Sequence, residues 1–423
     1  MKRLSLTLCI FISAILLVAG CSKKEKEMDS LGSIEGIWNG TINIPNQPLL
    51  VSFTFTKEDG TISIPSQGLQ KYPLASVELK GSDLVIQMTL PGQQITIDGS
   101  VEKDKVSGTF TQQGQSFPLQ LTKGSTEETP DTGEAVQIDL EEGKMTGVLE
   151  VPKGDGPFPL MVIIAGSGPT DHNGNSPLIP GKNNSLKMLA EELADKGVAS
   201  IRFDKRGVGE NQSLSGNEEN ILFDDFINDA AAWVQFAKND NRFSKVGIIG
   251  HSEGSLIGMV AAEKTDADSF ISIAGAGRSI DQVLLEQLEP QLPVNLLKES
   301  DDILQKLKKG EQVEKISPEL QSLFRPSAQP YMISWLKYDP VKELQKLSSP
   351  VLIINGTRDF QVPVADAEQL HDGKKDSKLV IIQNMNHILK EAPEDQVGNL
   401  ATYMDPTLPL AKGLMDEIID FLK

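Results

Sequence analysis

Apolar and polar residues alternate with a period of two in the first part of the chain. In LLVSFTFT (49–56) the residues Val51, Phe53 and Phe55 share one face, and DLVIQMTL (83–90) repeats the pattern. This period is typical of strands with one buried face. With turn residues such as KEDG (57–60) between the runs, it predicts about seven or eight strands in residues 31–123. We expect a small antiparallel all-β domain, either a barrel or a sandwich.

The pattern changes after a polar linker, GSTEETPDTGE (124–134). AVQIDL and MTGVLEVP suggest a β-hairpin, and then continuous apolar runs at 159–166, 245–250 and 350–356 indicate strands buried on both faces. Helical stretches such as SLKMLAEELADKG (185–197) separate these runs, and a last helix is expected near 408–421. Strands that alternate with helices predict an α/β fold, a doubly wound and mostly parallel sheet, over residues 135–423.

One connection in this second domain is far longer than a crossover needs. About 75 residues separate the strand that ends near Ala274 from the one that begins at Pro350. They follow the carboxyl end of a central strand, where ligands bind in open α/β sheets. We interpret residues 278–345, approximately, as a helical cap over a pocket.

The N-terminus has the composition of an export signal. Lys2 and Arg3 precede a short apolar stretch, so residues 1–20 read as a signal peptide that is too short for a confident membrane span. VAGC (18–21) resembles the lipobox of bacterial lipoproteins, which implies lipidation of Cys21 and a polar tether over 21–30. The alternative is a plain signal peptide. The only other cysteine, Cys9, leaves with the signal, so no disulfide is expected.

Charge excludes one class of partner. The chain carries 40 basic and 59 acidic residues, a net charge of −19. Nucleic-acid phosphates require basic surface, so we expect no nucleic-acid binding. The expected partners are a small-molecule ester substrate and, through the lipid on Cys21, a membrane.

The segment VGIIGHSEGSLIGMVAA (246–262) holds a G-x-S-x-G motif centred on Ser252. The motif alone does not distinguish a nucleophile from a serine in a small-residue turn. Here, however, an apolar strand enters it and a helix leaves it, the context in which such a turn exposes the serine hydroxyl. A hydroxyl needs a base to become a nucleophile, so an acid and a histidine should follow, in that order.

The chain has four histidines, and one lies where the base is expected. His387 follows the last strand, whereas His172 precedes Ser252, His371 lies at a helix end, and His251 adjoins Ser252 and is expected to point elsewhere. Asp359, in the loop after the strand at 350–356, is the candidate acid. An aspartate before a helix is also a common N-cap, so a structural role stays open for it.

An acyl-transfer site also needs amide donors for an oxyanion. We expect one at Glu253 and the other at Ser167 or Gly168, in the loop after the strand 159–166. GSG at 166–168 lacks the length and the lysine of a P-loop. No cluster has metal-ligand spacing, so neither a metal nor another cofactor is expected.

Residues 135–423 resemble an α/β-hydrolase of the esterase and serine aminopeptidase-like branch. The motifs AGSGPTDHNGN, RFDKRGVGEN, GHSEGS, PSAQPYMISWLKYDP and NGTRDFQVP…MNH stand in order, and the β-domain resembles the accessory domain fused to such enzymes in exported bacterial proteins. The resemblance implies Ser252 as nucleophile, His387 as base and Asp359 as acid. It implies that Asp204 and Arg206 hold the loop beside the oxyanion site. His172 departs from the family, which often has arginine there, and is expected to change the charge of the rim.

Three functions remain open at this point. The favoured one is hydrolysis of carboxylic esters. A peptidase is the alternative with the same chemistry, for which Glu286 and Glu289 in the cap could hold a substrate ammonium. The third is a binding lipoprotein with an inactive hydrolase module.

Overall fold

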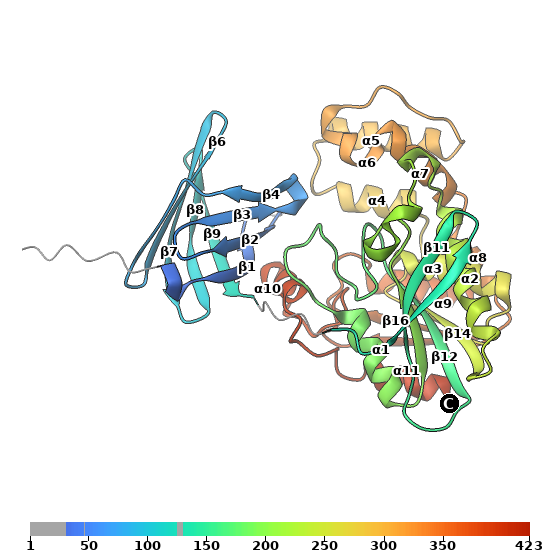
Figure 1. The fold of residues 1–423 in the computed structure, drawn as a ribbon. Coiled ribbons are helices and arrows are strands. Elements are labelled where there is room, and N and C mark those ends of the chain that lie inside the picture. Colours follow the sequence, from blue (N-terminus) through green and yellow to red (C-terminus); the bar gives the residue numbers. More distant parts are fainter. Residues whose placement is uncertain (1–30, 46, 125–129) are drawn as a thin grey trace, which may run out of the picture.

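The computed structural model describes residues 31–45, 47–124 and 130–423. The signal peptide, the tether and Cys21 lie outside these ranges. Within them the chain forms an all-β domain and an α/β domain that lie side by side (Figure 1). The predicted fold class is confirmed.

The first domain is one antiparallel sheet of nine strands in the order β4-β3-β2-β1-β9-β8-β7-β6-β5, curved into a half-barrel. Its core is built from the faces that alternate in the sequence, with Trp38, Phe53 and Ile86 fully buried. The expected count of seven or eight strands was low, because short strands such as β4, with the sequence LQKYP, lack a regular alternation. The strands are β1 (Gly36–Ile42), β2 (Leu49–Phe55), β3 (Gly60–Ile64), β4 (Leu69–Pro73), β5 (Ser76–Lys80), β6 (Asp83–Leu90), β7 (Gln93–Glu102), β8 (Lys105–Gln112) and β9 (Gln115–Lys123), with 3-10 turns η1 (Leu31–Ser33) and η2 (Pro65–Gln67).

The second domain is built on an eight-stranded sheet in the order β10-β11-β13-β12-β14-β15-β16-β17. The hairpin β10–β11 joins β13 antiparallel, and the pairs from β13 through β12 to β17 are parallel. Buried side chains form separate clusters on the two faces of the sheet. The strands are β10 (Glu134–Leu140), β11 (Gly143–Glu150), β12 (Phe158–Ile164), β13 (Ala199–Phe203), β14 (Phe243–His251), β15 (Phe270–Ile273), β16 (Val351–Gly356) and β17 (Lys378–Ile382).

Helices cover both faces of this sheet, and a group of them rises beyond its carboxyl edge (Figure 1). That group, α4 to α7, has its own apolar core around Leu304 and Phe324 and forms the cap. The last helix begins later than expected, because Leu410 pairs with Lys390 and Gly413 has a positive φ. The elements are α1 (Ser185–Asp195), η3 (Gly209–Leu214), η4 (Glu218–Asn220), α2 (Phe223–Lys238), α3 (Glu253–Thr265), α4 (Ile280–Leu288), α5 (Val294–Leu307), η5 (Pro318–Leu320), α6 (Gln321–Phe324), η6 (Pro326–Ala328), α7 (Gln329–Trp335), α8 (Pro340–Gln345), α9 (Val364–Gly373), α10 (Gln396–Ala401), η7 (Thr402–Met404) and α11 (Leu414–Leu422).

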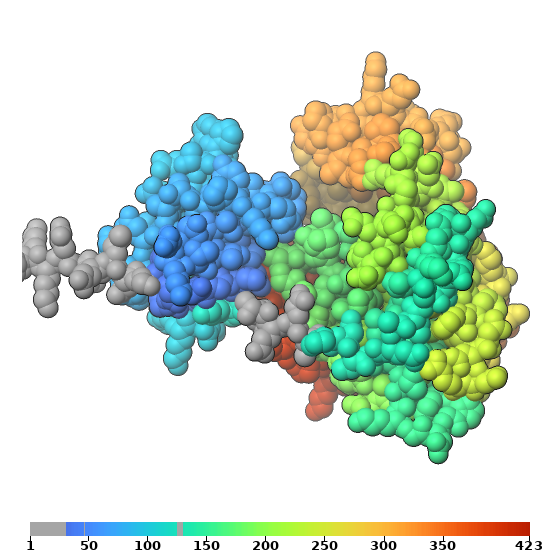
Figure 2. Space-filling view, in the orientation of Figure 1, coloured from blue at the N-terminus to red at the C-terminus, as the bar shows by residue number. Residues whose placement is uncertain are grey.

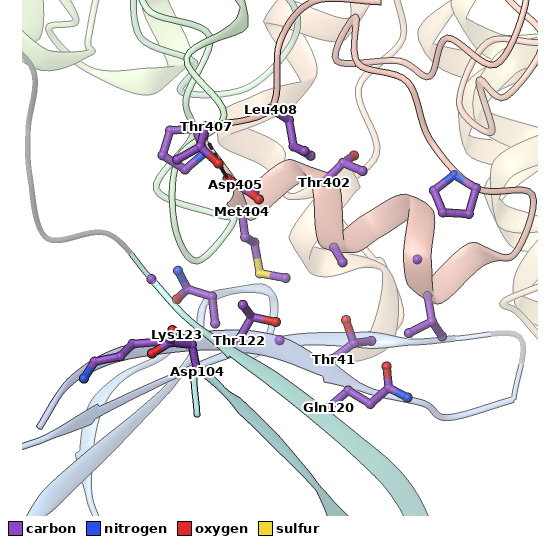
Figure 3. A pocket seen from close by; sticks show the side chains of 18 of the residues that line it. Thr41, Asp104, Gln120, Thr122, Lys123, Thr402, Met404, Asp405, Thr407 and Leu408 are labelled. Carbon is purple, nitrogen blue, oxygen red and sulfur yellow. Dashed lines mark hydrogen bonds between the residues drawn. The ribbon is translucent and has the colours of Figure 1, made fainter. Parts of the chain in front are cut away.

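The two domains touch in the space-filling view (Figure 2), and β1 lies beside α10 at this contact (Figure 1). Gly181, with φ of 85°, is enclosed there: a Cβ at this position would lie 2.8 Å from Asn39 Nδ2 and 3.0 Å from Met404 Cβ. A cavity of about 650 Å³ opens beside this contact. Thr41 and Gln120 form its floor, and Thr402 and Met404 lie opposite (Figure 3).

No helix in the described ranges has both the length and the apolar character needed to cross a membrane.

Candidate functional site

Ser252 lies in the sharp turn between β14 and α3. Its φ is 56° and its ψ −122°, a conformation that costs free energy for a residue with a side chain. The turn is tight enough to require its two glycines. A Cβ at Gly250 would lie 2.3 Å from the Gly254 carbonyl oxygen, and one at Gly254 would lie 2.4 Å from that of Ile164. The sequence therefore folds into a turn that presents the serine hydroxyl at the carboxyl edge of the sheet.

The structure brings Ser252, His387 and Asp359 together. His387 Nε2 lies 3.0 Å from Ser252 Oγ, and His387 Nδ1 lies 2.8 Å from Asp359 Oδ2. The His387 side chain is 6% exposed and that of Asp359 is not exposed. Three loops at the ends of β14, β16 and β17 thus contribute one side chain each to a continuous chain of hydrogen bonds.

The Asp359 carboxylate is fixed by its own loop. Its Oδ1 accepts hydrogen bonds from the backbone amides of Gln361, at 2.8 Å, and Val362, at 2.9 Å. One oxygen is therefore occupied by the backbone, and the other is directed to His387. The helix that follows, α9, begins only at Val364, so Asp359 is not its N-cap.

His251 has a role that the sequence did not indicate. Its Nε2 donates to the backbone carbonyl of His387 over 2.7 Å, and the two rings lie 5.0 Å apart. Burial lowers the pKa of His251 to about 4, and the neighbouring His387 adds to this effect. The ring is therefore neutral near pH 7, and it carries its proton on Nε2 because a carbonyl oxygen only accepts. The expectation that His251 points elsewhere missed this support for the His387 loop.

The expected oxyanion donors belong to two segments that meet beside Ser252. Glu253 is the first residue of α3, and Gly166 packs so closely that a Cβ there would lie 3.1 Å from Ser252 Cβ. Ser167 and Gly168 follow it and are exposed. Within the described part of the chain, the amides of Glu253, Ser167 and Gly168 donate to no protein acceptor. These N–H groups are available to a ligand at Ser252.

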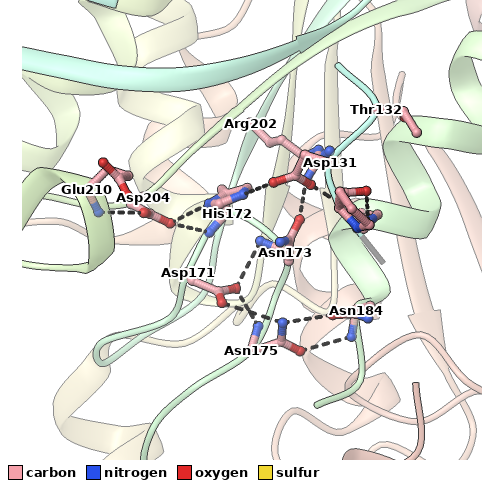
Figure 4. A network of polar contacts seen from close by, with 12 residues as sticks. Asp131, Thr132, Asp171, His172, Asn173, Asn175, Asn184, Arg202, Asp204 and Glu210 are labelled. Atoms are coloured by element: carbon pink, nitrogen blue, oxygen red, sulfur yellow. Dashed lines mark hydrogen bonds and ion pairs between the residues drawn. The ribbon is translucent and has the colours of Figure 1, made fainter. Parts of the chain in front are cut away.

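A second polar network joins the loop after β12 to the loop after β13 (Figure 4). His172 lies between two carboxylates, with Nδ1 2.6 Å from Asp204 Oδ1 and Nε2 2.9 Å from Asp131 Oδ2. Asp131, just before β10, also accepts from the buried Arg202 over 2.9 Å. Burial opposes the charged form of His172, but the two carboxylates outweigh it and raise the pKa of His172. His172 is thus not a rim residue: its side chain is 17% exposed and ties Asp131 to the loop.

Asp204 and Arg206 lie in the loop after β13, and both form hydrogen bonds with other residues of the protein. Asp204 accepts from the backbone amides of His172 and Glu210. Arg206 makes two hydrogen bonds, of 2.8 and 2.6 Å, with the buried Asp229 of α2. Both residues therefore hold the conformation of this loop.

The segment α10–η7 holds the loops of both His387 and Asp359. Asn386 Nδ2 donates to Thr402 Oγ1 over 2.8 Å and to Asn399 Oδ1 over 3.2 Å. Asn399 Nδ2 donates in turn to the carbonyl of Arg358, the residue before Asp359. Thr402 also lines the cavity between the domains, so this segment contacts the site on one side and the β-domain on the other.

Comparison with known proteins places this geometry in a family. The family model described as "Serine aminopeptidase, S33" matches residues 183–393, a range that contains Ser252, Asp359 and His387. The chain belongs to the α/β-hydrolases. It is also 27% identical over 378 residues to the esterase EstD of Thermotoga maritima, a match that covers 87% of this chain and 82% of that protein.

Further relatives of this α/β-hydrolase cover less of the chain. The AB hydrolase superfamily protein YisY of Bacillus subtilis is 27% identical over 244 residues, which is 52% of this chain and 86% of that protein. Among solved structures, Est1E from Butyrivibrio proteoclasticus aligns with 69% of this chain and 99% of its own, at 21% identity and a TM-score of 0.45.

Two large apolar side chains lie exposed in the loops that carry site residues of the hydrolase. Phe360, next to Asp359, is 54% exposed, and Leu178, whose Cδ1 lies 4.0 Å from the Cβ position of Gly168, is 53% exposed. In the cap, Glu286 pairs with Arg278 over 2.5 Å, and Glu289 is exposed on the same side of α4–α5. The loops of Asp359 and of the expected oxyanion donors therefore expose apolar surface, while Glu286 already has a basic partner.

Proposed function

We propose that this hydrolase cleaves carboxylic esters through an acyl-enzyme on Ser252. The observation that carries the proposal is the hydrogen-bond chain from Ser252 Oγ through His387 to Asp359, of 3.0 and 2.8 Å. These distances are within the range in which a base can take the proton of a nucleophile. The likeness to the esterase EstD supports an ester as substrate.

In the first half of the proposed reaction, His387 Nε2 takes the hydroxyl proton while Ser252 Oγ bonds to the ester carbonyl carbon. The carbonyl oxygen gains the negative charge and is bound by the amides of Glu253 and of Ser167 or Gly168. The intermediate then expels the alkoxide, which receives the proton from His387, and the acyl group stays on Ser252.

In the second half, His387 deprotonates a water molecule that attacks the acyl carbon, and collapse of this second intermediate releases the carboxylic acid and restores Ser252. Asp359 keeps the Nδ1 proton of His387 in place and stabilises the imidazolium. The exposed Phe360 and Leu178 are the surfaces that we assign to contact with apolar parts of the substrate. We also propose that the protein is exported and anchored to a membrane by a lipid on Cys21, as expected from residues 1–30.

The experiment combines substrates with a covalent probe. Wild type is expected to hydrolyse p-nitrophenyl acetate, butyrate and octanoate and to bind a fluorophosphonate probe covalently. Ser252→Ala should take no label, and its kcat/KM should be about 10⁵-fold lower than that of wild type. Ser255→Ala is the matched control, because Ser255 lies in the same helix and its hydroxyl contacts Ser272, 2.7 Å away. Its activity should stay within about threefold of wild type.

Two outcomes would overturn the proposal. Turnover of aminoacyl anilides without turnover of esters would favour a peptidase, the candidate suggested by the description of the matching family. A folded wild-type protein that takes no label would favour a binding protein.

A further inference from the structure

Lys205 is a buried cation that the proposed reaction leaves without a role. It follows Asp204 in the loop after β13, and its side chain is only 5% exposed. A lysine ammonium is strongly hydrated in water, so burying it is costly unless protein groups replace the water. The protein groups that contact the Lys205 ammonium therefore indicate its role.

The ammonium contacts both segments that carry the expected oxyanion donors. Lys205 Nζ donates to the backbone carbonyl of Gly166 over 2.6 Å and lies 3.4 Å from Glu253 Oε1. It also lies 5.4 Å from the centre of the Phe226 ring, a favourable cation–π distance. Glu253 supplies an oxyanion amide, and Gly166 directly precedes Ser167, which supplies the other candidate.

The contact with Gly166 has a direct geometric consequence. The Gly166 carbonyl and the Ser167 N–H belong to the same peptide unit, which is trans and therefore planar. In such a unit the C=O and the N–H point in opposite directions. A cation that holds the Gly166 oxygen from behind therefore fixes the direction of the Ser167 N–H on the other side, where Ser252 lies 3.1 Å from the Gly166 Cβ position.

The second contact extends this arrangement into the cap. The Glu253 side chain is 3% exposed, and burial together with this carboxylate raises the pKa of Tyr331 in α7. Tyr331 packs against Phe223, Phe226 and Trp335, and Phe226 is the ring that Lys205 also approaches. Lys205 thus stands between the Gly166 carbonyl and the Glu253 carboxylate and contacts both.

We infer that Lys205 is a positioning residue that sets both amide donors of the oxyanion site. The inference rests on the proposed function and adds to it the origin of the donor geometry. Lys205 does not touch the substrate: it aligns the Ser167 N–H through the Gly166 peptide and holds the start of α3 through Glu253. Because the donors must match the oxyanion and not the ground-state carbonyl, the loss of this alignment should affect the transition state more than substrate binding.

The test is Lys205→Met, which keeps the apolar stem and removes the charge. We expect kcat toward p-nitrophenyl butyrate to fall about 10²–10³-fold, with KM within about threefold of wild type. The second readout is inhibition by an alkyl trifluoromethyl ketone, which forms a tetrahedral alkoxide on Ser252. Its inhibition constant should rise by the same factor as kcat/KM falls.

The matched control is Lys187→Met, since Lys187 is also buried and donates to a backbone carbonyl, that of Pro130, over 2.8 Å. Its kinetic constants and its inhibition constant should stay within about threefold of wild type. If Lys205→Met does not fold, Glu253→Gln serves instead, with an expected loss of about tenfold in kcat and a parallel rise in the inhibition constant.

The inference is overturned if folded Lys205→Met keeps the wild-type kcat, or loses kcat while the inhibition constant stays unchanged. Either result leaves the proposed function standing, because that proposal fails only through the Ser252→Ala, labelling and substrate experiments.

Discussion

Two histidines of this protein each contact an aspartate through Nδ1, but their Nε2 atoms contact different kinds of group. His387 and His172 each place Nδ1 against an aspartate, at 2.8 Å from Asp359 and 2.6 Å from Asp204. On Nε2, however, His387 meets a serine hydroxyl, whereas His172 meets a second carboxylate, that of Asp131. An imidazole between a carboxylate and a hydroxyl can accept a proton and return it. An imidazole between two carboxylates is held as a cation and serves as a structural ion pair.

The comparison teaches that a His–Asp pair does not by itself identify a base. Both histidines lie in loops at the carboxyl edge of the sheet, and both aspartates are buried. In each case the group at Nε2 of the histidine decides its role. The following predictions test this by comparing matched substitutions at the two sites.

The largest difference should come from replacing the histidines themselves. His387→Gln is expected to lower kcat for p-nitrophenyl esters by about 10⁴-fold or more, because the base is removed. His172→Gln should stay within about tenfold of wild type, because glutamine still fills the space and no proton passes through this site. Steady-state kinetics gives kcat for both variants. Comparable losses in kcat would contradict the different roles assigned to the two histidines.

Substitutions of the two aspartates should affect different quantities, kcat for Asp359 and stability for Asp204. Asp359→Asn is expected to lower kcat about 10⁴-fold, because an amide on Nδ1 favours the wrong tautomer of His387. Asp204→Asn should instead lower the free energy of unfolding by about 1–3 kcal/mol, since Asp204 accepts from the backbone of His172 and Glu210 as well as from the ring. Kinetics and urea unfolding of the two variants give both quantities. A kinetic loss of 10⁴-fold in Asp204→Asn would show that the second pair also serves the reaction.

The smallest effect should appear as a dependence of stability on pH. The pKa of His172 is raised in the folded protein, so its ion pairs contribute fully below the usual histidine pKa of about 6.5. The contribution is lost as the pH rises through the higher folded-state pKa. The difference in unfolding free energy between wild type and His172→Gln should therefore shrink between pH 6 and pH 9, as measured by urea titration.

A His172 difference that grows with pH would contradict the assignment of His172 as a cation.

The sequence predicted those parts of the site that depend on chain order. Ser252, Asp359 and His387 each follow a strongly apolar run, and parallel strands bring their carboxyl ends to one edge, so the three side chains could be placed without coordinates. The number of strands in the β-domain was underestimated, because a short strand such as β4 has too few residues for a clear alternation. The cap helices were recognised as helical, but their contacts depend on packing between residues far apart in the chain.

The supporting contacts were beyond prediction for a different physical reason. His251 donates to a backbone carbonyl, and Lys205 does the same at Gly166. A backbone carbonyl is present in every residue, so no residue type in the sequence marks it as a partner. Likewise, Asp131 read as part of a polar linker, and only the fold brings it to His172.

The close approach at Gly181 has a consequence for the spacing of the two domains. Three segments, from β1, from the loop before α1 and from η7, meet where there is no room for even a methyl group. Any side chain at position 181 would therefore have to displace Asn39 or Met404, which come from different domains. A single glycine thus sets how closely the half-barrel and the α/β domain approach each other.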